Sequence, residues 1–217
     1  MKKNLTEIVF ILDRSGSMSG LEQDTIGGFN SLIEKQKKED GEAYISTVLF
    51  DHYSEVLHDR LDLKDIQPMT EKEYYVRGST ALLDAVGGAI RHIGNIHKYA
   101  RKEDIPEKTM FIIMTDGYEN ASRRYDYDEI RRMITRQKEK YGWEFLVLGA
   151  NIDVISEARK FGVDEEMAVE FLNDKKGTAV SYDAVCGAVS SCRTYGAVPP
   201  TWKANVEKDR KSRRRDH

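Results

Sequence analysis

Oxygen-bearing side chains gather in one short stretch near the start of this sequence. Residues 13–17, Asp-Arg-Ser-Gly-Ser, directly follow the apolar run 8–12. Alternate positions along an extended stretch share a side, so Asp13, Ser15 and Ser17 can turn one carboxylate and two hydroxyls inward while Arg14 faces elsewhere. These are hard oxygen ligands, which suit Mg²⁺ or Mn²⁺ better than zinc. A serine-rich helix N-cap is the alternative explanation for the same residues.

Two further oxygen-bearing residues stand at comparable places later in the chain. Thr80 precedes the amphipathic pattern of a long helix, and Asp116 follows the nearly all-apolar run 109–115. Where the order of strands in a parallel sheet reverses, a crevice opens, and we expect Asp13 and Asp116 to face each other there. Two facing carboxylates repel unless a cation lies between them. With three hydroxyls they supply about what one octahedral cation needs, with water completing the shell.

The elements that must position these residues follow from the hydrophobic pattern. We expect strands over 6–12, 43–50, 55–61, 109–115, 143–148 and 167–172, and helices over 21–38, 128–141, 152–161 and 176–195, with another long helix after Thr80. Such alternation predicts an α/β fold, a doubly wound, mostly parallel six-stranded sheet with helices on both faces. The expected strand order is 3-2-1-4-5-6, and a hairpin should make the 55–61 strand antiparallel at one edge.

The composition limits the class of protein. The 217 residues carry a formal net charge of −3, which gives no case for a nucleic-acid or membrane partner. No apolar run is long enough for a signal peptide or a membrane span. Cys186 and Cys192 are typical of buried free thiols in a reducing compartment, so we expect a cytoplasmic monomer. One domain should cover residues 1–197, and residues 198–217 should form a basic, flexible tail that includes the run 210–215.

The three spaced stretches together resemble the von Willebrand factor type A domain with its metal-ion-dependent adhesion site. The pattern consists of Asp-x-Ser-x-Ser, met by Asp13, Ser15 and Ser17, then Thr80 on a later loop, then Asp116 in Thr-Asp-Gly. The resemblance covers about residues 5–195 and is to members of the stand-alone, cytoplasmic bacterial type.

This resemblance implies a role for each residue of the set. Ser15 and Ser17 would bind Mg²⁺, or Mn²⁺, directly, and Thr80 would bind it directly or through water, depending on the ligand state. Asp13 and Asp116 would act mostly through water or hydrogen bonds. A partner protein would place Glu or Asp in the open coordination position. The sequence therefore predicts a metal-dependent protein-interaction module that is not an enzyme and has no catalytic or organic-cofactor residues.

Two other functions are alternatives to this one. A Mg²⁺-dependent phosphoryl-transfer or hydrolytic enzyme is disfavoured because the sequence lacks a G-x-x-x-x-G-K-[ST] phosphate loop. Ser15 stands where an aspartyl-nucleophile phosphatase would carry a second Asp, and Met18 stands where a serine nucleophile would be needed. Nucleic-acid binding through the basic tail is the other alternative, although the rest of the chain is acidic.

Several residues near the predicted site allow two interpretations. Ser79 departs from the family, many of whose members carry glycine there. Glu119 and Asn120 could line the rim or lie in a solvated loop. Asp84 could support the metal ligands from behind or could be an ordinary acid in the first turn of a helix. Residues 123–127 could contact a partner or be solvated. His52, His58, His92 and His97 lack metal-ligand spacing and are expected to be surface or packing residues.

Overall fold

The two most apolar runs of the sequence form neighbouring strands at the centre of a sheet. In the computed structural model, which describes residues 1–213, these are β1 (Lys2–Asp13) and β4 (Pro106–Thr115). They pair in parallel, with Leu12 opposite Met114, so both strands end at the same edge. Residues that are apolar on both strand faces belong in such a position, because helices cover both sides.

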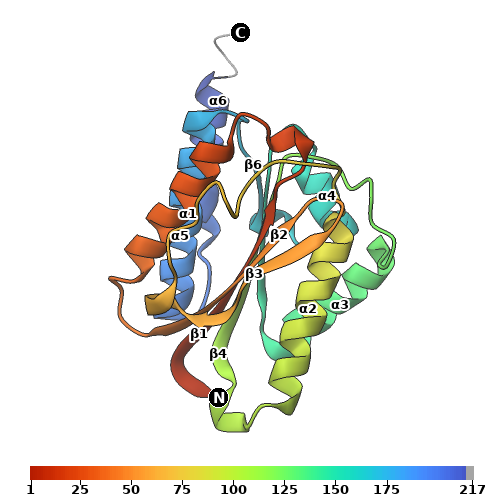
Figure 1. The fold of residues 1–217 in the computed structure, drawn as a ribbon. Helices are drawn as coiled ribbons and strands as arrows, with labels where there is room; N and C mark the ends of the chain where they lie inside the picture. Colours follow the sequence, from red (N-terminus) through yellow and green to blue (C-terminus); the bar gives the residue numbers. More distant parts are fainter. Residues whose placement is uncertain (214–217) are drawn as a thin grey trace.

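Four more strands complete the sheet around this central pair (Figure 1). They are β2 (Glu42–Phe50), β3 (Ser54–Asp62), β5 (Glu144–Gly149) and β6 (Ala168–Glu170). The order is β3-β2-β1-β4-β5-β6, with β3 antiparallel to β2 and the other pairs parallel. The predicted six-stranded order and the antiparallel edge strand are therefore confirmed.

Helices pack on both faces of the sheet. They are α1 (Glu22–Gln36), α2 (Leu82–Tyr99), α3 (Tyr127–Tyr141), α4 (Val154–Lys160), α5 (Lys175–Tyr195) and α6 (Ala204–Arg213). Short 3-10 turns are η1 (Gly16–Met18), η2 (Leu63–Asp65), η3 (Lys102–Asp104), η4 (Glu165–Met167) and η5 (Pro200–Lys203). Over residues 1–213, none of the helices is both long enough and apolar enough to cross a membrane.

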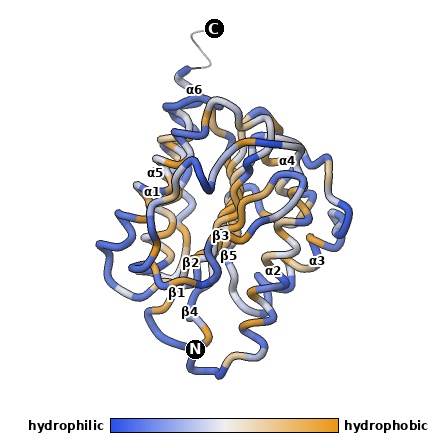
Figure 2. The backbone as a smooth tube through the Cα atoms, viewed as in Figure 1, coloured by the Kyte–Doolittle hydropathy of each residue, from blue (hydrophilic) through white to orange (hydrophobic). Residues whose placement is uncertain are grey.

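Alternation along the central strands divides the core into two halves. Ile8, Phe10 and Leu12 of β1 join the core beneath α1 and α5, whereas Val9 and Ile11 join the core beneath α2 and α3. Hydrophobic residues accordingly concentrate along the strands, and hydrophilic ones dominate the outer loops (Figure 2). Two buried layers hold the sheet rigid, which fixes the positions of the loops at its carboxyl edge.

The flexible tail predicted for residues 198–217 is wrong over residues 198–213. Trp202 and Val206, spaced four residues apart, are buried in the core that α5 also joins, and the Trp202 indole donates to the Glu166 carbonyl at 2.8 Å. Helix α6 therefore belongs to the domain and packs beside α5 and β6. The last part of the basic run, Arg214 and Arg215, lies outside the described residues.

Candidate metal centre

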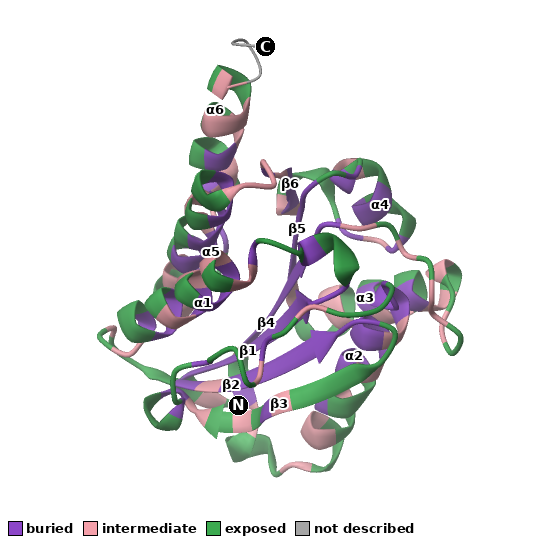
Figure 3. Cartoon of the chain, turned by 45° about the horizontal axis from the view of Figure 1, so that its top comes forward, coloured by how far each residue is buried: buried purple, intermediate pink, exposed green. Residues whose placement is uncertain are grey.

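The predicted site residues meet where the strand order reverses, at the carboxyl edge of β1 and β4. Leu12 pairs with Met114, so Asp13 and Thr115 end neighbouring strands and Asp116 follows directly. Figure 3 shows these strands as buried, between α1 and α5 on one side and α2 and α3 on the other. The ends of the two strands that carry or precede Asp13 and Asp116 are therefore neighbours at one edge of the sheet.

Asp13 is held as an almost fully buried carboxylate. Its Oδ1 accepts the Ser15 backbone N–H at 2.7 Å, and its Oδ2 accepts the Thr115 hydroxyl at 2.6 Å. Only 1% of the residue is exposed. Burial raises the pKa of Asp13 to about 6, against the hydrogen bonds from Thr115 and Ser15 that favour the ionised form. Thr115, a strand residue that sequence reasoning did not select, thus fixes the orientation of Asp13.

A chain of short contacts joins the first stretch to Asp116. The Ser15 and Ser17 hydroxyl oxygens are 3.0 Å apart, and the Ser17 hydroxyl donates to Asp116 Oδ1. The other carboxylate oxygen, Oδ2, accepts the Asn173 side-chain amide at 3.3 Å. Burial raises the pKa of Asp116 as well. Two serines and two aspartates therefore converge on one side of this crevice.

Thr80 reaches the same place from its own loop. A Cβ atom added to Gly117 would lie 3.1 Å from the Thr80 hydroxyl oxygen and 3.2 Å from that of Ser17. Both hydroxyls therefore approach the backbone directly after Asp116, at a point where a side chain would crowd them. Thr80 is 3% exposed, and its backbone N–H donates to Asn120 Oδ1 at 2.9 Å. The structure brings all five predicted residues together.

The donor set fits a divalent cation with a preference for hard oxygen ligands. Burial raises the pKa of both Asp13 and Asp116, so their ionised forms are disfavoured. Within residues 1–213, neither carboxylate has an ion-pair partner to offset this cost. A cation would supply the missing positive charge. The described residues contain no group of three or more His, Cys, Asp or Glu side chains able to hold a metal. Hydroxyl oxygens must therefore provide part of any coordination shell here.

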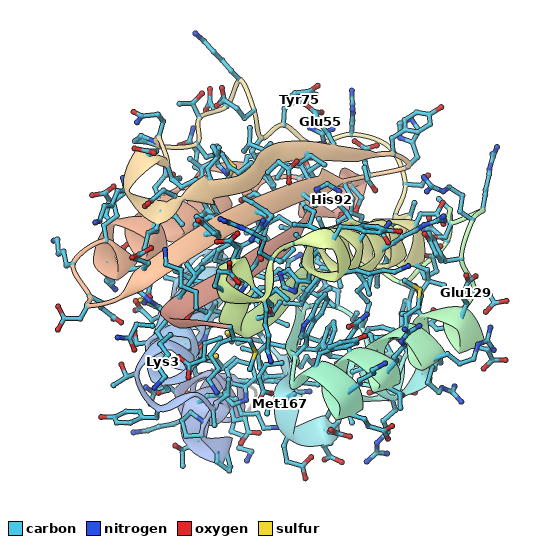
Figure 4. All side chains as sticks on the ribbon, turned by 90° about the horizontal axis from the view of Figure 1, so that it is seen from below. Lys3, Glu55, Tyr75, His92, Glu129 and Met167 are labelled. Atoms are coloured by element: carbon cyan, nitrogen blue, oxygen red, sulfur yellow. The ribbon has the colours of Figure 1, made fainter. Side chains whose placement is uncertain are left out.

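Arg14 is expected to face away from the predicted metal ligands. Its side chain lies in the protein interior and pairs with acids beside the site. Its side chain is fully buried, with Nε 3.0 Å from Asp51 Oδ2 and a terminal nitrogen 2.7 Å from Glu55 Oε2. Arg77 adds a contact of 2.8 Å to the same Asp51 oxygen. Desolvation raises the pKa of Asp51, but hydrogen bonds and the two arginine charges outweigh it and hold the pKa below its usual value. Figure 4 shows Glu55 beside Tyr75, whose ring Arg14 approaches to 5.1 Å.

Backbone hydrogen bonds connect the two hydroxyl-bearing loops. Gly16 N donates to Gly78 O at 3.0 Å, and Arg77 N donates to Arg14 O at 2.9 Å. The buried Tyr74 hydroxyl donates to the Asp13 carbonyl at 2.5 Å. Gly78 has φ +69°, and a Cβ there would lie 2.3 Å from a His52 ring nitrogen, so this turn needs glycine. The loop that precedes Thr80 therefore runs alongside the loop that comes after Asp13, and hydrogen bonds join the two.

The neighbouring acids that allowed two interpretations hold loops in place. Glu119 accepts the backbone N–H of Leu83 at 2.9 Å, at the start of α2. The Asp84 carboxylate accepts three successive backbone N–H groups of residues 123–125, at 2.9 to 3.1 Å. The histidines contact protein acids or a hydroxyl: His52 with Asp51, His58 with Thr47, His92 with Asp59 and His97 with Glu7. These side chains therefore have partners other than the predicted metal ligands.

No protein-family model matches the sequence, and no curated protein matches it. Solved structures do match its fold. A von Willebrand factor type A protein from Catenulispora acidiphila has a TM-score of 0.60 and 16% identity, over 88% of this chain and 43% of that one. This is the fold of a von Willebrand factor type A domain. This chain spans less than two thirds of the length of each structure that it matches here.

Two further structures match the fold of this chain. Proximal thread matrix protein 1 of the mussel byssus, described with a zinc-occupied metal-ion-dependent adhesion site, has a TM-score of 0.58 and 15% identity, over 88% of this chain and 47% of that one. The PilB minor pilin of Streptococcus sanguinis, as a D319A mutant, has a TM-score of 0.61 and 11% identity, over 92% and 64%. At these identities the likeness establishes the fold alone.

Proposed function

We propose that this chain is a metal-dependent protein-interaction module. Ser15, Ser17 and Thr80 would hold Mg²⁺, with Mn²⁺ as a substitute, and Asp13 and Asp116 would act through water or hydrogen bonds. The bound cation would supply a Lewis-acidic position that accepts a Glu or Asp side chain of another protein. The observation that carries the proposal is the pair of buried carboxylates that have no ion-pair partner among residues 1–213, beside three converging hydroxyls.

The shared fold supports the proposal in a second way. One structural neighbour is described with zinc at its metal-ion-dependent adhesion site, so this fold accommodates a divalent cation at a site of that type. The choice of Mg²⁺ rests on the present donors, which are oxygens and include no thiolate or imidazole.

Nucleic-acid binding through the C-terminal residues has less support. Arg210 pairs with Glu170, and Arg213 pairs with Asp174 at 2.6 Å and also with Asp209. Arginines that already neutralise acids of the domain offer little to a phosphate backbone. No described feature favours an enzyme over a binding module.

Metal binding is the first test. We expect wild-type protein to bind Mn²⁺ in a titration followed by electron paramagnetic resonance, and Asp13→Ala to lose that binding. Asp65→Ala, at an exposed acid of η2 away from the crevice, is the matched control and should bind as wild type does. Equal Mn²⁺ binding by Asp13→Ala would contradict the assigned site.

Partner chemistry is the second test. An array of peptides that each carry one Glu or Asp should bind in Mg²⁺ and not in EDTA, and the corresponding Gln or Asn peptides should fail in both. Turnover of p-nitrophenyl phosphate or of single-stranded DNA in Mg²⁺, lost in Asp13→Ala, would instead support the enzyme alternative.

A further inference from the structure

One side chain at the crevice lies outside the predicted set and has only half of its hydrogen-bonding groups satisfied. Asn173 donates from its amide nitrogen to Asp116 Oδ2 at 3.3 Å. Its carbonyl oxygen is shielded from solvent, and no donor within residues 1–213 reaches it. An unpaired buried acceptor costs free energy, so its retention beside a cluster of oxygens needs an explanation.

The orientation of this amide is dictated by its neighbour. If the group were rotated by half a turn, its carbonyl oxygen would face the Asp116 carboxylate, which is also an acceptor. The amide nitrogen must therefore face Asp116. The carbonyl oxygen is then the atom left for a ligand.

The segment that carries Asn173 is fixed at both ends. On one side, Phe171 N donates to Gly149 O at 2.9 Å, which continues the register of β6 on β5. On the other side, Asp174 caps α5 by accepting Gly177 N at 2.8 Å. A Cβ at Gly177 would lie 2.0 Å from the Leu172 carbonyl oxygen, so helix and loop are in close contact.

Helix α6 reinforces the same segment. Arg210 pairs with Glu170 at the end of β6, and Arg213 pairs with Asp174 at the start of α5. The two arginines thus contact residues on either side of Asn173. A side chain on a segment anchored in this way is positioned in advance, as a metal-site residue needs to be.

We infer that Asn173 belongs to the metal centre and offers its side-chain carbonyl oxygen as a sixth donor from a fourth segment of the chain. The inference rests on the proposed function. An amide oxygen is a hard donor of the kind that Mg²⁺ and Mn²⁺ accept. It is also neutral: Asp13 and Asp116 already balance the two charges of the cation, so a third carboxylate would weaken the attraction for an acidic partner. Asn at this position therefore favours binding of both the metal and an acidic ligand.

The test compares two substitutions with a charge control. Asn173→Ala removes the carbonyl oxygen, and we expect Mn²⁺ affinity to fall about tenfold. Asn173→Asp keeps an oxygen in place and loses the amide donor, so Mn²⁺ affinity should match or exceed that of wild type while binding of Glu peptides in Mg²⁺ falls. Asn151→Asp adds the same charge at an exposed position after β5 and should change Mn²⁺ affinity less than Asn173→Asp does.

Each outcome of this experiment decides something. Wild-type Mn²⁺ affinity in Asn173→Ala would overturn the inference and leave the proposed function intact. Equal losses in the Ala and Asp variants would show that Asn173 serves only as an amide donor to Asp116, and would also overturn it. Failure of wild-type protein to bind Mn²⁺ would remove the proposed function and the inference together. Melting temperatures in EDTA separate loss of the donor from loss of the fold.

Discussion

At the scale of single residues, Asp13 carries an unfavourable charge until a cation arrives. Its pKa of about 6 lies above the value of 3.8 for an unperturbed aspartate, because burial disfavours the ionised form. The native state therefore holds a proton more tightly than the unfolded chain does. Stability from this group is fully present below pH 3.8 and is lost as the pH rises through 6.

The first prediction follows from that charge. In EDTA at pH 8, Asp13→Asn should unfold less readily than wild type, by up to about 3 kcal/mol for a shift of about two pKa units. The difference should shrink as the pH is lowered to 5. Urea denaturation at both pH values measures it. In millimolar Mn²⁺ the order should reverse, because only wild type gains stability from the metal. A variant that is less stable than wild type in EDTA at pH 8 would contradict this account.

The second prediction concerns protons and metal together. A cation and a proton compete for the Asp13 carboxylate, so Mn²⁺ affinity should be nearly constant above pH 7 and fall below pH 6. One pH unit below the pKa, the fall should be about tenfold. Titration calorimetry in buffers of different ionisation enthalpy should also detect proton release at pH 6. An affinity that stays flat between pH 5 and 7 would show that Asp13 does not take part.

The third prediction distinguishes the role of Thr80 from the roles of Asp13, Ser15 and Ser17. Asp13, Ser15 and Ser17 are close in sequence, whereas Thr80 comes from another loop. Under the proposed function, Thr80 would bind the metal directly only in the liganded state. A metal ligand that binds directly only in the partner-bound state stabilises that state over the partner-free state, and so contributes to the affinity for the partner. Thr80→Ala should therefore weaken binding of a Glu peptide far more than binding of Mn²⁺, and Asp13→Ala should weaken both.

Both affinities are measured by the titrations described above, with Ser79→Ala as the control, because Ser79 is the exposed neighbour of Thr80. Equal losses of Mn²⁺ affinity in Thr80→Ala and Asp13→Ala would show that Thr80 is a permanent ligand.

At the scale of elements, the sequence predicts what depends on local pattern. Runs 8–12 and 109–115 are apolar on both strand faces, which requires central strands, and the short hairpin at residues 51–53 requires an antiparallel edge. The five site residues follow because each lies just beyond a recognisable strand or just before a recognisable helix. Their convergence needs only the order of the strands.

Features that depend on contacts between distant segments could not be predicted from the sequence. Arg14 has the charge of a surface residue, and its burial is explained by Asp51, directly after β2, and by Glu55 of β3. Asn173 has no motif around it and gains meaning only beside Asp116. Trp202 of η5 and Val206 of α6 are the two apolar anchors of the C-terminal segment, and they stand among many charged residues, so the segment has the composition of a solvated tail.

The fourth prediction tests the contact between α5 and the segment before it. Gly177→Ala would place a Cβ 2.0 Å from the Leu172 carbonyl oxygen, so the loop must shift, at a cost of about 1–3 kcal/mol in stability. Gly187→Ala on the same helix meets nothing within 4 Å and should be neutral or stabilising by up to about 1 kcal/mol. Urea denaturation in EDTA compares the two, and equal effects would show that the loop yields freely.

At the scale of the whole molecule, the candidate centre depends on the complete fold. Asp13 ends β1, Asp116 directly follows β4, Thr80 precedes α2, and Asn173 precedes α5. Only Asp13, Ser15 and Ser17 are close in sequence. The unfolded chain therefore offers a cation three donors at most, and the proposed site exists only once β1 and β4 have paired and both helix layers are in place.

Because the donors are dispersed along the chain, the metal can bind only after the chain has folded. A cation that binds only the folded state cannot accelerate folding, but it must dissociate before the protein can unfold. We therefore expect millimolar Mn²⁺ to lower the unfolding rate constant and to leave the refolding rate constant almost unchanged. Stopped-flow measurements in Mn²⁺ and in EDTA would show this as a shift of one arm of the chevron plot. The metal would then act mainly on the lifetime of the folded protein, and in a metal-poor medium each molecule would open more often.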